Sequence, residues 1–262
     1  MELAMPQSAV KQDAYYWRLI ATALSFSVFG IGGVILLLVV FPLQSLLPGD
    51  ALQRRRRARL TVSRLFMFFI KFMRAMGVLT FQFDGAERLG RPGQLIIANH
   101  PSLLDVVFLI AHLRDTGCVV KESLWRNPSM RGPVQACGYI SNNGSAEMLD
   151  DAAQTLRDGQ TLIIFPEGTR TTPGLPPTFH RGAAAIALRG AQVITPVYIS
   201  VNPTTLTKAE PWYRIPARRM HYQLRVGADL QPAQYLAGHS APIASRHLNQ
   251  QLHQQYTQEL AV

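Results

Sequence analysis

The sequence predicts an α/β fold, a mostly parallel sheet flanked by helices, with an N-terminal membrane helix or helical hairpin. Two observations lead to this prediction. From residue 84 onward, short continuous apolar runs alternate with helical patterns and turns, which is typical of strands buried on both faces of a parallel sheet. Before residue 84 the apolar runs are long, and Leu19–Leu43 contains no charged residue.

Composition limits the class of protein. The chain has 262 residues, of which 48% are hydrophobic and 16% charged, so it can fill a sizeable core and is not intrinsically disordered. Its two cysteines, Cys118 and Cys137, are too few for a disulfide scaffold or a thiolate-only zinc site. Residues 1–80 hold ten Lys and Arg against three Asp and Glu, and this basic leader indicates an anionic partner surface.

The run Leu19–Leu43 is long enough to cross a hydrocarbon core of about 30 Å as a helix, and it is too long for a secretory signal. Arg54–Arg57 and Arg59 follow this run, whereas only Lys11 and Arg18 precede it. The positive-inside bias therefore places the later residues in the cytoplasm. We expect a protein of the cell membrane, of bacterial inner-membrane type, with its active site on the cytoplasmic face.

A second apolar stretch covers residues 60–83 and carries Arg64, Lys71 and Arg74 toward one side of a helix. A basic stripe beside a bulky apolar face favours a helix that lies in the headgroup region. A core helix with a solvated edge is the alternative, and both segments could also form a hairpin that dips into one leaflet. The expected division is a membrane-associated helical segment at 1–80 and an α/β domain at 81–262.

The elements of the α/β domain are short apolar runs bounded by turn residues. Strands are expected at 94–98, 118–121, 161–165, 193–201 and 220–226, the last at an edge of the sheet. Helices are expected at 103–113, 145–157, 181–189 and 245–260. Ligands of such sheets bind at the carboxyl ends of the strands, and two of these ends carry unusual residues.

The first is Asn99-His100-Pro101-Ser102-Leu103-Leu104-Asp105. Pro101 biases His100 toward an extended backbone, and Ser102 suits an N-cap with Asp105 three residues later. The Asp105 carboxylate can then reach the His100 ring, fix its tautomer and leave the other nitrogen as a general base. A plain capping box with an incidental His100 is the alternative. Ser102 as a nucleophile lacks the glycines of a nucleophile elbow.

The second is Phe165-Pro166-Glu167-Gly168-Thr169-Arg170. Gly168 allows a tight turn, Arg170 offers a planar fork for phosphate or carboxylate, and Glu167 can orient a hydroxyl or the arginine. A surface turn with a Glu–Arg pair is the alternative reading of this segment. The segment is not a P-loop, because the G-x-x-x-x-G-K pattern is missing.

Together, Asn-His-(x)4-Asp at 99–105 and Phe-Pro-Glu-Gly-Thr-Arg at 165–170 resemble the signature blocks of the glycerophospholipid acyltransferases, typified by 1-acylglycerol-3-phosphate acyltransferase. The resemblance covers roughly residues 80–230. Lys121, the segment His180–Ala183 and Pro196 within Ile194–Ile199 add weaker support. The family's second block typically carries an arginine thought to hold the acceptor phosphate. This chain has Asn142 or Asn143 there, which puts lysophosphatidic acid as the acceptor in question.

The resemblance implies an O-acyltransferase of phospholipid biosynthesis that moves a fatty acyl group to a hydroxyl of a lysophospholipid-type acceptor. His100 would be the general base and Asp105 its orienting group. Glu167, Gly168, Thr169 and Arg170 would bind the acceptor, with Asn99, Ser102 and Lys121 in possible supporting roles. Acyl-CoA or acyl-carrier protein would be the co-substrate, without a cofactor or a metal.

Three other functions remain open. The acceptor could be a non-glycerophosphate lipid, such as a lyso-amino-acid lipid or a glycolipid. The chain could be a hydrolase, although a single His–Asp pair offers too few ligands for a metal. It could also be a membrane-anchored, non-catalytic lipid-binding protein. Nucleic acid is not an expected partner, because the Arg54–Arg57 run abuts an apolar helix rather than stacking aromatic residues.

Overall fold

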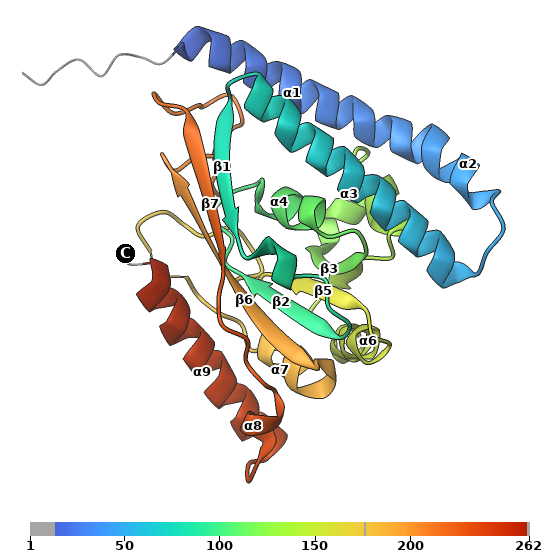
Figure 1. Ribbon diagram of the computed structural model, residues 1–262, viewed down its shortest axis with the longest axis vertical. Helices are drawn as coiled ribbons and strands as arrows, with labels where there is room; N and C mark the ends of the chain where they lie inside the picture. Colours follow the sequence, from blue (N-terminus) through green and yellow to red (C-terminus); the bar gives the residue numbers. More distant parts are fainter. Residues whose placement is uncertain (1–13, 176, 261–262) are drawn as a thin grey trace, which may run out of the picture.

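A seven-stranded sheet in the order β1-β7-β6-β2-β5-β3-β4 lies at the centre of the described chain (Figure 1). The computed structural model describes residues 14–175 and 177–260. All neighbouring strands are parallel except β6 and β7, which are antiparallel. The strands are β1 (Leu79–Asp84), β2 (Gln94–Ala98), β3 (Thr116–Lys121), β4 (Ile140–Asn142), β5 (Thr161–Ile164), β6 (Val193–Asn202) and β7 (Met220–Val226).

Helices cover both faces of this sheet, as Figure 1 shows. One face packs against α3 (Ala51–Ala75), α4 (Asp105–His112) and α5 (Arg131–Ala136). The opposite face packs against α6 (Ala146–Arg157), α7 (Gly182–Gly190) and α9 (Ala241–Leu260), with the short α8 (Ala233–Leu236) beside α9. The central strands β2 and β5 are buried on both faces, which explains their continuous apolar sequences.

The predicted α/β class is therefore confirmed, and so are the strands expected from continuous apolar runs. The expected edge position of residues 220–226 is wrong, because β7 lies between β1 and β6. The true edge strands are β1 and β4, which the sequence analysis missed. The second apolar stretch, expected to be one helix over 60–83, is divided between two elements, because α3 ends at Ala75 and β1 begins at Leu79.

The first helical segment runs continuously through α1 (Tyr15–Ile35), a π-helical segment (Leu36–Val40) and α2 (Phe41–Ser45). Among the described residues, this is the one helix that is both long enough and apolar enough to cross a membrane. Its inner side packs on α3, where Phe29 lies between Phe66 and Phe69 with ring centroids 5.8 and 5.1 Å apart. Its outer side exposes large apolar residues, including Ile20, Ile31 and Leu38.

Helix α3 is amphipathic, and its apolar side belongs to the core of the domain. Phe66, Ile70 and Met73 are buried in the same cluster as α4 and the sheet. The inner side of α3 is thus part of the core, while its outer side exposes Leu65 and Phe68 together with Arg64 and Lys71. Near the start of α3, the buried Arg59 donates to the Cys137 carbonyl at 2.9 Å and pairs with Asp115 at 3.0 Å.

Candidate active site

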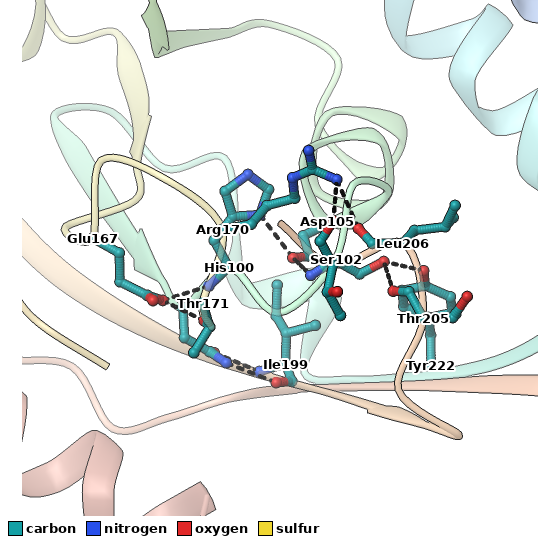
Figure 2. Close-up of polar contacts among 12 residues, drawn as sticks. His100, Ser102, Asp105, Glu167, Arg170, Thr171, Ile199, Thr205, Leu206 and Tyr222 are labelled. Atoms are coloured by element: carbon teal, nitrogen blue, oxygen red, sulfur yellow. Dashed lines mark hydrogen bonds and ion pairs between the residues drawn. The ribbon is translucent and has the colours of Figure 1, made fainter. Parts of the chain in front are cut away.

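His100 and Asp105 are in direct contact at the carboxyl end of β2 (Figure 2). His100 Nδ1 lies 2.8 Å from Asp105 Oδ2, which confirms the contact expected from the sequence. The Asp105 side chain is fully buried, and this burial raises the carboxyl pKa, while the hydrogen bond to His100 opposes the rise. The second ring nitrogen of His100 has no hydrogen-bond partner among the described residues, and His100 lines a cavity. It is placed to accept a proton there.

The start of α4 differs from the expected capping arrangement. The helix begins at Asp105, and Ser102 is not its N-cap. The Ser102 N–H still donates to Asp105 Oδ2 at 2.8 Å, so the carboxylate holds two donors on one oxygen. The Ser102 hydroxyl contacts the Tyr222 hydroxyl at 2.6 Å and donates to the Thr205 carbonyl at 3.0 Å. Ser102 is buried and binds β7 and the loop that precedes it, and it does not line the cavity.

Glu167 holds the backbone of His100 from the side opposite Asp105. Its Oε1 accepts the His100 N–H at 2.8 Å and the Thr171 hydroxyl at 3.0 Å. The His100 carbonyl in turn accepts the Thr171 N–H at 2.8 Å. Burial raises the Glu167 pKa. The Phe165 ring stacks on the His100 ring with centroids 4.3 Å apart, so Phe165 and Asp105 hold the imidazole while Glu167 holds the backbone.

Arg170 does not pair with Glu167. Its Nη1 donates to the carbonyls of Leu206 and Thr207, at 2.8 Å each, while the residue also lines the cavity beside His100. Its charge contributes to lowering the Asp105 pKa against the effect of burial. Arg170 therefore ties the turn after β5 to the loop after β6 and leaves part of its guanidinium toward the cavity.

Lys121 and Asn142 are register partners at the carboxyl ends of β3 and β4. Both are exposed and both line the cavity that contains His100. Asn142 is also close to Gly168, since a Cβ placed on that glycine would lie 3.7 Å from Asn142 Nδ2. Gly168 adopts a φ of +65°, which favours glycine at this turn. Neither Arg131 nor Arg181 lines this cavity, although both are described and exposed.

The cavity at His100 has a volume of about 530 Å³ and extends from the strand ends to the underside of α1. Its polar end holds His100, Lys121, Asn142, Thr169 and Arg170. Its other end is lined by aromatic and aliphatic side chains from α1, α3 and α4, namely Phe26, Phe29, Phe66, Phe69, Leu104 and Val107. An amphipathic ligand with a long apolar chain matches this division.

A second cavity of about 550 Å³ lies on the other side of the turn at 165–169, against α6 and α7. Phe165, Gly168, Thr169 and Asn142 line both cavities. Glu167 and His180 line only the second. In the described part of the chain, no group of three or more His, Cys, Asp and Glu side chains is placed to hold a metal ion.

The structure thus gathers His100, Gly168, Thr169, Arg170 and Lys121 around one cavity, with Asp105 buried behind His100, but it places Asn99 elsewhere. The buried Asn99 amide exchanges two 2.8 Å hydrogen bonds with the backbone of Ile199 and joins β2 to β6. The sequence analysis did not predict that Phe165, two residues before Glu167, stacks on the His100 ring. It also missed Tyr222, which no sequence signal marked because it contacts Ser102 from 120 residues away.

Residues 80–200 match the family model described as Acyltransferase. This range contains the carboxyl ends of β2, β3, β4 and β5. The chain is therefore similar to acyltransferases over this region, which is just under half of its length. Curated relatives named 1-acyl-sn-glycerol-3-phosphate acyltransferase are similar to it. The Saccharomyces cerevisiae protein is 28% identical over 76% of this chain and 64% of its own length. The Helicobacter pylori protein is 31% identical over 48% of this chain and 55% of its own length.

The match to these relatives therefore spans less than two thirds of their length. Among solved structures, the 1-acyl-sn-glycerophosphate acyltransferase PlsC from Thermotoga maritima superposes with a TM-score of 0.66. The alignment covers 94% of this chain and 97% of that chain, at 18% identity. This likeness shows a shared fold over nearly the whole of both chains.

Proposed function

We propose that this protein transfers a fatty acyl group from a thioester to a hydroxyl of a lysophospholipid. The second ring nitrogen of His100 takes the proton of the acceptor hydroxyl, and the oxygen attacks the thioester carbonyl. The carbon–sulfur bond breaks, the thiolate leaves and is protonated, and an ester forms. Asp105 stabilises the protonated ring through Nδ1. The observation that supports this most strongly is that the half-buried His100, bound to the buried Asp105, faces a cavity with one polar and one apolar end.

The apolar end of the cavity supports a fatty acyl donor. Aromatic rings of α1 and α3 line it, and the described residues offer no charge in that part of the lining. An acyl chain extending from a thioester at His100 toward α1 would replace water on this surface. Acyl-CoA and acyl-carrier protein share this thioester chemistry, and both are candidate co-substrates.

The polar end supports an acceptor with an anionic headgroup. Lys121 and Arg170 are the two Lys or Arg side chains that line the cavity in the described structure, and Gly168 and Thr169 form its turn. The names of the relatives favour 1-acyl-sn-glycerol-3-phosphate as the acceptor. Asn142 supports a second candidate, a less charged hydroxylated lipid. Its neutral amide lines the cavity at about the position where the glycerophospholipid acyltransferases carry an arginine.

Glu167 acts as a positioning residue in this proposal. Its carboxylate binds the His100 N–H and the Thr171 hydroxyl rather than pointing into the cavity that contains His100. Asn99 and Ser102 support the site in the same indirect way, through β6 and β7. The predicted acceptor-binding role of Glu167 stays a prediction.

Membrane association accompanies the acyl transfer in this proposal. The outer side of α1 presents apolar residues, and the cavity reaches its inner side at Phe26, Phe29 and Gly30. Since α1 packs along α3, whose outer side carries the exposed Arg64 and Lys71, we favour a helical pair lying in one leaflet over an isolated span. Residues 1–80 then form the membrane-associated part, residues 81–262 the α/β domain, and the site faces the cytoplasm.

The test is an acyl-transfer assay with purified protein in detergent micelles. Radiolabelled acyl-CoA and acyl-carrier protein are each offered with 1-acyl-sn-glycerol-3-phosphate, a zwitterionic lysophospholipid and a neutral lyso-lipid. Formation of the diacyl product is expected, together with its loss in His100→Ala. Thioester hydrolysis at an undiminished rate without acceptor would indicate a hydrolase. Lipid binding without turnover of any donor would indicate a non-catalytic lipid-binding protein.

A further inference from the structure

The connection between β6 and β7, residues 203–219, joins the candidate site to the start of α1; we call it the β6–β7 loop. On the site side, its Leu206 carbonyl accepts from Arg170 at 2.8 Å and from the Leu103 N–H at 3.1 Å. On the α1 side, the buried Arg18 donates to the Pro216 and Ala217 carbonyls at 3.0 and 2.7 Å. The loop is thus fixed at both ends and close to the site.

The outer surface of the β6–β7 loop is basic. It carries four exposed cationic side chains against one acid, Glu210. Glu210 is occupied by the N–H and hydroxyl of Thr207. The four cations are Lys208, Arg214, Arg218 and Arg219, and none of their side chains has an ion pair or hydrogen bond to another described residue. Their charges stabilise nothing within the described structure and are available to an anionic partner.

Amphipathic aromatic residues accompany these charges. Trp212 and Tyr213 of the loop are 41% and 59% exposed, and Tyr16 and Trp17 at the start of α1 are 77% and 51% exposed. Both groups lie where the loop meets α1: Arg18, next to Trp17, binds the Pro216 and Ala217 carbonyls, and the Trp212 ring lies 6.0 Å from Phe26, further along α1. Trp and Tyr concentrate where a membrane meets water, because their rings are apolar and their polar atoms stay hydrated.

We propose that the β6–β7 loop is a membrane-contact element that binds anionic phospholipid headgroups beside the active site. This proposal depends on the proposed function only because both require α1 to associate with the membrane. The exposed apolar side of α1 would then be flanked by two basic groups, Arg54–Arg57 near one end of the α1–α3 pair and the loop near the other (Figure 1). Contact at both ends holds the pair along the membrane surface and keeps the site at the headgroup level.

The charge test uses the full-length protein and vesicles of two compositions, phosphatidylcholine alone and equal parts of phosphatidylcholine and phosphatidylglycerol. The variant is Arg214→Gln/Arg218→Gln/Arg219→Gln. The matched control, Arg157→Gln/Arg189→Gln/Arg246→Gln, removes three charges from α6, α7 and α9 on the opposite face of the sheet. We expect the loop variant to lose about tenfold or more in partitioning to anionic vesicles, with little change for the control. Equal losses in both variants would overturn the proposal.

The depth test uses Trp212 as a reporter, in a protein carrying Trp17→Phe and Trp125→Phe. Brominated lipids in anionic vesicles should quench its fluorescence, and the three loop substitutions should reduce the quenching. An unquenched Trp212 in vesicle-bound protein would overturn the proposal, and so would a loop variant that binds vesicles normally but no longer uses acyl-carrier protein. Acyl transfer in detergent micelles is expected to be unchanged in the loop variant. A wild type without transfer would instead refute the proposed function and leave the quenching result standing.

Discussion

The backbone N–H of His100 donates to Oε1 of Glu167 at 2.8 Å, while the ring of the same histidine binds Asp105. Two buried carboxyl groups from different strand ends therefore hold one imidazole in place. Burial raises the pKa of both carboxyl groups, so the arrangement opposes their ionisation. Such a site is held together by the surrounding fold at some expense of stability.

Glu167→Gln should make the protein more stable relative to the wild type as the pH rises. Glutamine keeps an acceptor oxygen for the His100 N–H and the Thr171 hydroxyl. Because the folded pKa of Glu167 lies above its unfolded pKa, the folded wild type binds the proton more tightly. Wild-type stability therefore falls as pH rises from the unfolded pKa, about 4.3, to the folded pKa. The glutamine variant lacks this loss.

Thermal unfolding in detergent between about pH 4 and pH 7 measures the difference. Glu167→Ala is the control, since it leaves the buried His100 N–H without its partner and should destabilise by about 1–3 kcal/mol at every pH. If the difference in stability between the glutamine variant and the wild type stayed constant across this range, the pKa of Glu167 would be the same in the folded and unfolded protein.

His100→Ala should reduce acyl transfer by about 10²–10⁴-fold without unfolding the protein, because it removes the group placed to take the acceptor proton. Asp105→Asn should reduce transfer less, since an imidazole remains although its tautomer is no longer fixed. Initial rates in micelles give the comparison, and His112→Gln is the control. His112 is also on α4, but its Nδ1 contacts the Phe108 carbonyl and it does not line the cavity. Full activity of folded His100→Ala would end the general-base assignment.

Arg59 and Arg56 both contact Asp115, but their substitutions should differ in cost. Arg59 is 3% exposed and also binds Gln160 and the Cys137 carbonyl, whereas Arg56 is 55% exposed. Arg59→Ala leaves buried acceptors unpaired and should lower the free energy of unfolding by about 2–4 kcal/mol. Arg56→Ala should cost less than about 1 kcal/mol. Denaturant unfolding of the two variants in the same detergent compares them, and equal costs would contradict the structural role given to Arg59.

Gly30 lines the apolar end of the cavity, and substitution there should change the preferred acyl donor. A Cβ on Gly30 would lie 3.8 Å from Ser129 Oγ, an ordinary contact, so the helix tolerates a side chain at this position. Gly30→Leu should occupy part of the cavity and shift the preference toward shorter acyl chains, as measured by competition between donors of different length. Gly30→Ala is the control and should keep the wild-type order. An unchanged order in the leucine variant would place the acyl chain outside this cavity.

The strands around the site were predictable because their sequences are dictated by burial on both faces. The runs that became β2 and β5 both contain Leu-Ile-Ile and are short and bounded by turn residues, a pattern typical of a strand buried on both faces. β1 was missed because it follows α3 closely and its Phe81 and Phe83 look like a continuation of the same apolar stretch. The inner position of β7 depends on its pairing with β1, from about 140 residues earlier, which no local pattern encodes.

Within the site, the contact between His100 and Asp105 was predictable, but the surrounding cavity was not. His100 and Asp105 are five residues apart, so local geometry sufficed to bring them together. The Ser102 hydroxyl, expected at a helix cap, is held instead by Tyr222 and Thr205, which are more than 100 residues away in the sequence. The cavity was beyond prediction, because its apolar lining comes from three helices whose inward residues are indistinguishable in sequence from core residues.

Asn142→Arg should improve the use of 1-acyl-sn-glycerol-3-phosphate relative to neutral and zwitterionic acceptors. Asn142 lines the cavity next to Gly168 and is in register with Lys121, so an arginine there would add a cation at the polar end. One charge-assisted contact is worth roughly 1.5–3 kcal/mol, or about 10- to 150-fold in relative kcat/KM. The wild type, with Lys121 and Arg170 alone, should discriminate less strongly in favour of a phosphate monoester.

Competition between acceptors in one reaction measures this ratio directly. Asn143→Arg is the matched control, because Asn143 follows directly after β4 but does not line the cavity, and it adds the same charge. Lys121→Gln in the Asn142→Arg background should remove part of the gain if both cations hold the same phosphate. A wild type that already prefers the phosphate acceptor, with a preference that Asn142→Arg leaves unchanged, would show that Lys121 and Arg170 suffice and that Asn142 does not determine the choice of acceptor.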